Sequence, residues 1–244
     1  MATVGGWRLT FAPYWIGLIT AVAVLKVLPP SKRGEGTLSE QLRRAAPYVR
    51  NPVVLGATGM TFVLFVLIFG LFLTVLPVHL DEEFGIDAAG RGLILAVPAV
   101  TSTITALTLG RLRQRWGVRP LLVAGSICLA VGIGILGVAP SVPILLLGPF
   151  VYGFGEGVLI PTLQDIVAGV PPASSRGSVV AFFVGVTRLG QTAGPIATGL
   201  ALERAGAPGL FLAGAVASML LAGIQPLALG KFRSRQEVAA PRTN

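Results

Sequence analysis

Long apolar stretches recur along this chain, and they leave it few ways to fold. A helix needs roughly 20 residues to cross about 30 Å of hydrocarbon, and seven stretches approach or exceed that length. They are Leu9–Leu28, Val53–His79, Gly92–Gly110, Leu121–Ala139, Ile144–Ala168, Val179–Leu202 and Leu210–Leu229. The sequence does not show the alternating ten-residue segments of a membrane β-barrel. We therefore expect an all-α integral membrane protein with seven transmembrane helices.

The composition supports this class and excludes others. Only 12% of the residues are charged and 53% are hydrophobic, whereas a soluble domain has about 25% charged residues. The single cysteine, Cys128, excludes an intrachain disulfide, and the single histidine, His79, excludes a site built on two imidazoles. We expect no metal and no cofactor. The chain also lacks H-E-x-x-H, G-x-S-x-G and a glycine-rich phosphate loop, so we expect no enzyme.

The charges are distributed unevenly between the two sides of the predicted membrane. Most of the 19 lysines and arginines fall between the first and second spans, between the third and fourth, before the sixth, and in the tail. Acidic residues mark the other side: Asp81, Glu82, Glu83, Asp87 and Glu203. Basic loops stay in the cytoplasm, which places the N-terminus outside and the C-terminus inside. Topology thus explains the net charge of +9, and we expect no nucleic-acid partner.

The chain divides into four predicted segments. Residues 1–29 form the first transmembrane helix, 30–52 a basic cytoplasmic connector, 53–230 a six-helix membrane bundle, and 231–244 a basic cytoplasmic tail. Within the connector, Thr37-Leu-Ser-Glu40 fits a capping box that would start a short amphipathic helix ending near Pro47. This helix would present Arg43 and Arg44 to anionic lipid headgroups.

The segment between the third and fourth spans carries a recognisable motif. Its spacing resembles the loop signature of the major facilitator superfamily, glycine-x-leucine-x-aspartate-arginine-x-glycine-x-arginine. The matching residues are Gly110, Leu112, Arg115, Gly117 and Arg119. Gln114 stands where the family has aspartate, so the resemblance implies a conformational loop without its carboxylate.

Two further segments extend the resemblance in the right order. Gly153-Phe-Gly155-Glu-Gly157 with Pro161 is similar to the family's tenth helix, and Pro171–Gly177 to the next turn. The segment Gly190–Gly199, with Gly194 and Pro195, resembles the glycine–proline signature of the eleventh helix and the antiporter signature of the fifth. The resemblance implies helices six to twelve of a twelve-helix fold: a six-helix bundle preceded by one extra helix. Independently, such glycines permit close helix packing.

Two ionisable residues lie deep inside predicted spans, where such groups are costly and are functional candidates. At 1.5 Å per residue, Glu156 and Arg188 both lie roughly 14–18 Å from a membrane face, so they could meet. Helical spacing places other polar side chains beside them: Tyr152, Gln164, Thr187 and Gln191. These residues line a substrate or proton pathway in one interpretation; in the other, Glu156 and Arg188 form a buried ion pair that orients two helices. Thr101, Thr105 and Thr108 are expected at the same cavity, and His79 is expected to be exposed at the outer loop.

The resemblance implies a transporter of a small molecule across the cytoplasmic membrane. Proton-coupled efflux is favoured by the segment Gly190–Gly199. Alternating access requires two bundles, and this sequence supplies one. The alternative is therefore a truncated or split fragment without independent transport, which would assemble with a missing N-terminal half or a second copy.

Overall fold

A computed structural model describes residues 11, 14–27 and 37–228 of the chain. The chain separates into two compact units, Met1–Thr37 and Leu38–Asn244. In the first, helix α2 covers Tyr14–Val27; it is mainly apolar, with Lys26 in its last turn, and is exposed throughout. It lies within the predicted first span, whose remaining residues, apart from Phe11, are outside the described part of the chain.

The second unit is helical in every element that the structure describes. Its elements are α3 (Leu38–Val49), α4 (Pro52–Val66), the π-helix η2 (Leu67–Val75), α5 (Leu76–Glu82), α6 (Ala88–Trp116), α7 (Val118–Val138), α8 (Val142–Gly169) and α9 (Ala173–Ala228). The amphipathic α3 was expected in the connector, and it belongs to this compact unit. It begins after Thr37, as the capping box predicts, and continues through Pro47 to Val49.

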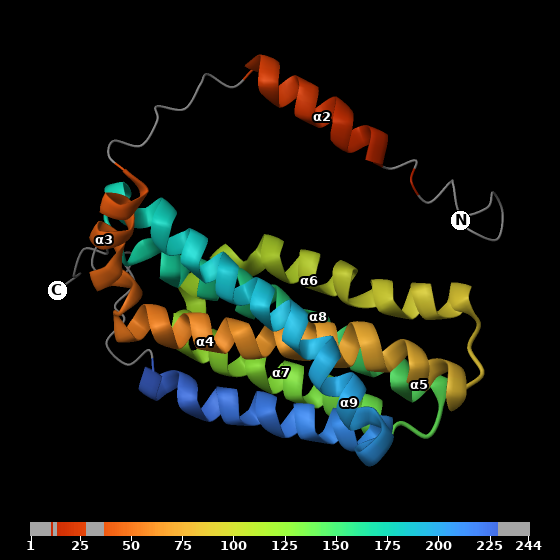
Figure 1. The fold of residues 1–244 in the computed structure, drawn as a ribbon. Helices are drawn as coiled ribbons and strands as arrows, with labels where there is room; N and C mark the ends of the chain where they lie inside the picture. The colour runs from red at the N-terminus through yellow and green to blue at the C-terminus, as the bar shows by residue number, and fades with distance from the viewer. Residues whose placement is uncertain (1–10, 12–13, 28–36, 229–244) are drawn as a thin grey trace. The chain divides into compact units, whose positions relative to one another are not determined.

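Five helices of the described chain are long and apolar enough to cross a membrane. They contain the six predicted bundle spans because α9 holds two of them. Gly206, with φ 67° and ψ 166°, interrupts α9, and in Figure 1 the chain reverses there so that its two limbs, residues 173–205 and 207–228, run in opposite directions. Only glycine adopts this conformation without strain. The all-α, multi-pass membrane fold is confirmed.

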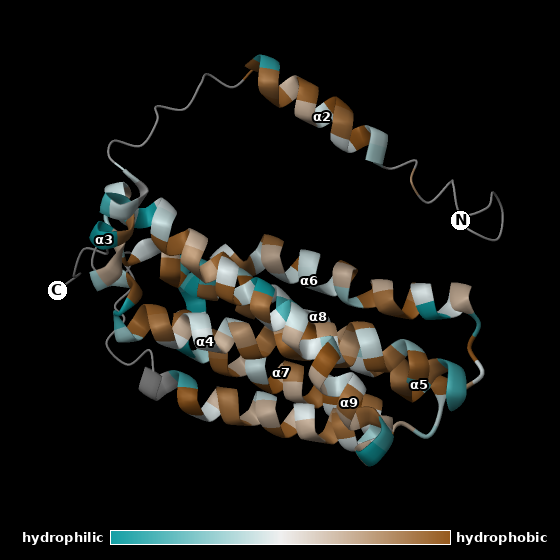
Figure 2. Cartoon of the chain, viewed as in Figure 1, coloured by the Kyte–Doolittle hydropathy of each residue, from teal (hydrophilic) through white to brown (hydrophobic). Residues whose placement is uncertain are grey.

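Polar groups gather at the two ends of the bundle, and apolar residues fill the length between them (Figure 2). A lipid-spanning backbone must bond to itself, and helices achieve this within each segment. At the ends, side chains complete the bonding: Asn51 accepts from the Val53 N–H at 2.9 Å, and Asp87 accepts from the Gly90 N–H at 2.9 Å. Gly117, at φ 80°, forms the turn from α6 to α7.

Glycines let α8 pack closely against α7 on one side and α6 on the other. A Cβ at Gly132 of α7 would lie 2.6 Å from the Tyr152 nitrogen of α8. On the α6 side, a Cβ at Gly157 would lie 2.6 Å from the Ser102 carbonyl oxygen. Carbon atoms do not approach backbone atoms this closely, so these positions require glycine. Helix α8 is therefore held between α6 and α7 by direct backbone contact.

A second close contact joins α4 and η2 to the first limb of α9. A Cβ at Gly190 would lie 2.7 Å from the Phe62 carbonyl oxygen, and one at Gly194 would lie 2.7 Å from that of Val66. One turn further, the Thr198 hydroxyl donates to the Gly70 carbonyl oxygen at 3.2 Å. The glycine signature of the predicted eleventh helix therefore acts here as a small-residue packing face.

The backbone contact at Gly132 makes a testable prediction. Gly132→Ala should lower the free energy of unfolding by about 1–3 kcal/mol, because α7 and α8 must move apart. Gly134→Ala on the same helix is the matched control, since its Cβ would lie 3.6 Å from the Ala215 Cβ, an ordinary contact. The measurement is denaturant unfolding of the purified chain in detergent. Equal stability of the two variants would contradict the packing.

Candidate functional site

Tyr152 is the most deeply buried of the predicted pathway residues. Its side chain is 1% exposed, and its ring stacks on Phe72 of η2 with centroids 4.7 Å apart and planes 7° apart. Its hydroxyl group is buried and has no hydrogen-bond partner in the described structure. The stack fixes the face of α8 that carries Tyr152 against the π-helix, and it leaves one unsatisfied donor inside the bundle.

Glu156 lies one turn beyond Tyr152 on α8. Its side chain is half-buried, and among residues 37–228 its carboxylate forms no hydrogen bond or ion pair with the side chains that the structure describes. Side chains on a helix lean toward its N-terminus, which directs the Glu156 carboxyl group back toward the turn of Tyr152. A carboxyl group in this position, without a basic partner, is chemically free to exchange a proton or to meet a ligand.

Arg188 does not provide the partner that the sequence suggested. It is exposed on α9, and its Nη1 donates to the Gln191 Oε1 at 2.8 Å. Neighbouring Thr187 is buried and donates to the Phe183 carbonyl oxygen at 2.8 Å. The buried ion pair between Glu156 and Arg188, one of the two interpretations, is therefore not formed in this structure. Equal depth along two helices did not bring the two charged groups together.

The remaining predicted polar residues are scattered. Gln164 continues the Tyr152–Glu156 spacing on α8 and is exposed. Thr101 and Thr105 are buried at 2% and 5% exposure, where they face Gly153 and Gly157 of α8, and Thr105 bonds to its own helix. These two threonines pack α6 against α8, so their expected place at a cavity is wrong. The reason is that α6 turns its small residues toward the glycines of α8.

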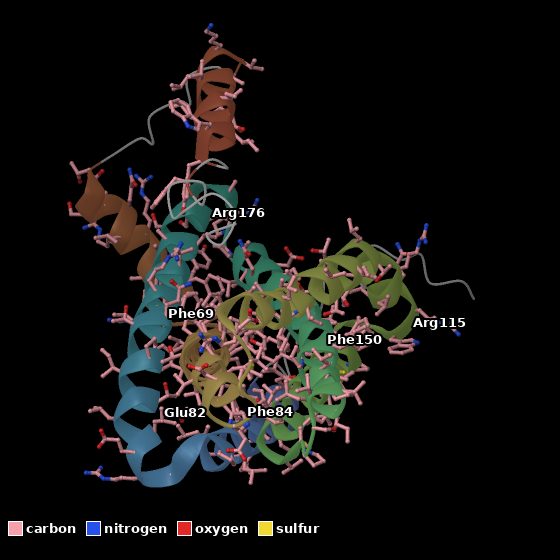
Figure 3. All side chains as sticks on the ribbon, turned by 90° about the vertical axis from the view of Figure 1, so that its right-hand side faces the viewer. Phe69, Glu82, Phe84, Arg115, Phe150 and Arg176 are labelled. Atoms are coloured by element: carbon pink, nitrogen blue, oxygen red, sulfur yellow. The ribbon has the colours of Figure 1, made fainter. Side chains whose placement is uncertain are left out.

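The predicted conformational loop is mostly helical. Helix α6 continues through Gly110 and Leu112 to Trp116, and only Gly117 has a turn conformation. Leu112 packs against a small apolar cluster of Leu109, Leu121 and Val158. Arg115 projects from the edge of the bundle in Figure 3, whereas Phe69 of η2 lies among the helices. Arg119 lies in the first turn of α7.

An ion pair that the sequence did not predict joins α6 to α8. Arg113 Nη1 lies 2.6 Å from Asp165 Oδ2, and Arg113 Nη2 donates to the Thr162 hydroxyl at 2.9 Å. Arg113 is 18% exposed, and Thr162 is buried. Arg113 stands next to Gln114, the position where the family motif has aspartate. The sequence does place a basic residue, Arg113, and an acidic residue, Asp165, near the same end of two different spans. This similarity in position alone did not predict that the two side chains pair.

His79 is buried, and the prediction that it is exposed is wrong. Its side chain is 7% exposed. The imidazole ring packs edge-on against Phe84, with centroids 5.6 Å apart, and against Phe211 of α9, with centroids 5.5 Å apart. The aromatic contacts cover the ring although acidic residues follow it in the sequence.

The glycines and proline predicted on α9 have separate surroundings. Gly190 and Gly194 are buried against α4 and η2, as described above, whereas Pro195 is half-buried. Next to this contact, the Thr74 hydroxyl donates to the Phe69 carbonyl oxygen, five residues earlier, at 2.7 Å. That spacing matches the π-helical pitch of η2. A π-helix beside a glycine interface is a place where a helix can change its winding.

Comparisons with known proteins agree with this architecture. The sequence model of the Major Facilitator Superfamily matches residues 58–243. The MFS-type efflux transporter phmH of Phaeosphaeria nodorum is 25% identical over 190 residues, covering 76% of this chain and 32% of phmH. The quinolone resistance protein NorA of Staphylococcus aureus is 26% identical over 147 residues, covering 60% of this chain and 38% of NorA.

A solved structure shows the same fold. The crystal structure of the human organic anion transporter MFSD10 aligns with a TM-score of 0.75 at 20% identity, over 88% of this chain and 57% of that one. The chain thus spans about a third of the two relatives described here and just over half of the solved structure.

The Arg113–Asp165 pair predicts a measurable coupling between α6 and α8. In a double-mutant cycle of Arg113→Ala and Asp165→Ala, we expect a coupling of about 0.2–1 kcal/mol in unfolding free energy, as found for ion pairs with an exposed partner. The coupling should decrease as salt is added, because Asp165 is 64% exposed. The control cycle pairs Asp165→Ala with Arg111→Ala, an exposed arginine two residues earlier. A coupling of the same size in both cycles would refute the pair.

Proposed function

This chain belongs to the major facilitator superfamily, and we propose that it forms the C-terminal half of a proton-coupled efflux transporter for a small molecule. In this proposal, it spans the cytoplasmic membrane with its N-terminus outside and its C-terminus in the cytoplasm. The efflux activity named for phmH supports export as the direction, and the quinolone resistance named for NorA is consistent with export. The basic residues at the end of the bundle where α4 begins support the orientation.

The observation that carries the proton coupling is the unpaired carboxylate of Glu156. Burying a charge without a partner is unfavourable, and binding a proton relieves that cost. Glu156 can therefore alternate between a protonated form and a charged form that is paired with a cationic group of the substrate. A carboxyl group locked in an ion pair with Arg188 would be less suited to this role.

The other predicted site residues take supporting roles in this proposal. Tyr152 offers its free hydroxyl group one turn from Glu156, and Gln164 extends the same path toward the cytoplasm. Arg188 and Gln191, joined by their hydrogen bond, supply donors from α9 next to buried Thr187. In this proposal the half-buried and exposed side chains among them line the pathway, and the buried side chains of Tyr152 and Thr187 lie behind this lining.

In this proposal, the conformational change of the transport cycle takes place at the closely packed contact around η2. Gly190, Gly194 and Pro195 let the first limb of α9 slide on α4 and η2 while the π-helix rewinds. The motion then reaches the basic end of the bundle through the segment that joins α6 to α7, which contains Gly110, Leu112, Arg115, Gly117 and Arg119. The Arg113–Asp165 pair supplies the carboxylate interaction that Gln114 lacks.

A second candidate function is that of an assembly partner without transport of its own. Alternating access moves two bundles around a central site, and this chain spans about a third of the two relatives described above. The second bundle would come from a separate N-terminal half or from a second copy of the chain. Either arrangement places a second wall opposite Glu156.

Substitution of Glu156 tests the proton role. In everted membrane vesicles that hold the complete assembly, this chain together with the second bundle, we expect a pH gradient to drive uptake of norfloxacin, a quinolone probe. Glu156→Gln should reduce this uptake by about 100-fold, the scale of a positioned proton-transfer group. Glu203→Gln, an exposed carboxylate near the Gly206 turn, is the control and should retain full uptake. Full gradient-driven uptake by Glu156→Gln would exclude the proton role.

Cross-linking tests the assembly. The full chain is cross-linked in native membranes and its mass is compared with the 25.2 kDa of one chain. A homodimer gives twice this mass, and a split transporter gives this mass plus that of a second polypeptide. A strictly monomeric chain without transport would exclude both assemblies.

A further inference from the structure

Helix α3 is attached to the bundle by one face. Ala45 is 2% exposed, and Tyr48 and Val49 are partly buried against the same apolar core that contains residues of α4 and α9. The helix packs against α9 and, less extensively, against α4. Its apolar face is therefore already covered by protein and does not need lipid to cover it.

The rest of the circumference of α3 is open: Leu42 lies beside the covered face, one turn before Ala45, and Arg43 and Arg44 follow it around the helix in steps of about 100°. Leu42 is 56% exposed, and Arg43 and Arg44 beside it are exposed as well. Within residues 37–228, neither guanidinium group has an ion-pair partner. An exposed leucine at the border of the covered face, with two free arginines on the open side of the helix, is the composition that helices lying at a membrane surface present to headgroups.

The surroundings of α3 favour an anionic partner. Figure 1 shows α3 at the end of the bundle where α4 begins, and exposed Arg111, Arg115 and Arg176 lie at that same end. Among the described residues there, the acidic side chains are Glu40 and Asp165, and Asp165 is already paired with Arg113. The local charge is therefore strongly positive, which complements a negatively charged membrane surface.

We propose that Leu42, Arg43 and Arg44 form a docking surface for anionic phospholipid headgroups of the cytoplasmic leaflet. The arginines contact the phosphate groups while Leu42 enters the boundary between headgroups and acyl chains. Because the other face of α3 packs on α9, a bound lipid holds α3 against the helix that also carries Arg188 and Gln191. Anionic lipid thereby stabilises the packed bundle, whether or not the chain transports by itself.

The test titrates lipid into the purified full chain in neutral detergent and follows the midpoint of thermal unfolding. We expect phosphatidylglycerol to raise the midpoint and phosphatidylcholine to leave it unchanged. Arg43→Gln combined with Arg44→Gln should raise the half-saturating phosphatidylglycerol concentration about 25-fold, at about fivefold for each charge. The control, Arg233→Gln with Arg235→Gln, removes the same charge from the tail and should respond like the wild type.

Two further measurements distinguish lipid binding from other causes of a higher unfolding midpoint. Inorganic phosphate at the same concentration should not raise the midpoint, and Leu42→Gln should weaken the response to phosphatidylglycerol. Equal midpoints of the wild type and the α3 double variant in phosphatidylcholine would show that the variant folds normally. The proposal is overturned if the α3 variant responds to phosphatidylglycerol like the wild type, if the tail variant loses the response equally, or if inorganic phosphate reproduces it.

Discussion

Backbone contact between helices is the interaction on which this bundle depends. Lipid tails are as apolar as leucine, so the hydrophobic effect does not drive one membrane helix toward another. Dispersion and close fit must do so, and both are greatest where the side chain is smallest. Gly132 and Gly157 bring α7 and α6 against α8, and Gly190 and Gly194 bring α9 against α4 and η2. Larger residues at these four positions would move the helices apart.

This packing decides which polar groups occupy the interior. Because α8 is held on two sides, its Tyr152 face turns toward η2 and stacks on Phe72. Glu156 follows one turn later, without a basic partner in the described chain. The same arrangement brings Arg113 to Asp165 at one end of the bundle. The same glycine contacts thus position both the unpaired carboxylate of Glu156 and the ion pair between Arg113 and Asp165.

The sequence was most informative about position along the membrane normal and least informative about neighbours across helices. All six predicted bundle spans fall on observed helices: the first on the continuous run of α4, η2 and α5, the next three on α6, α7 and α8, and the last two on α9, where the break at Gly206 separates them. Glu156 and Arg188 were correctly placed inside their helices, but their side chains do not form the ion pair that the sequence suggested. His79 was expected at the surface because of the acidic residues after it, but the ring of Phe84, five residues later, and the ring of Phe211, from the distant α9, cover it.

The sequence by itself determined the membrane class, the spans, the charged ends and the family, because hydrophobic length, charge and motif spacing are local properties. A rise of 1.5 Å per residue converts sequence position into depth. Only the tertiary structure decided that Arg113 pairs with Asp165, that Arg188 bonds to Gln191, and that α3 packs on α9 while Arg43 and Arg44 remain exposed. These outcomes depend on how each helix is rotated about its axis, and contacts between residues far apart in the chain set that rotation.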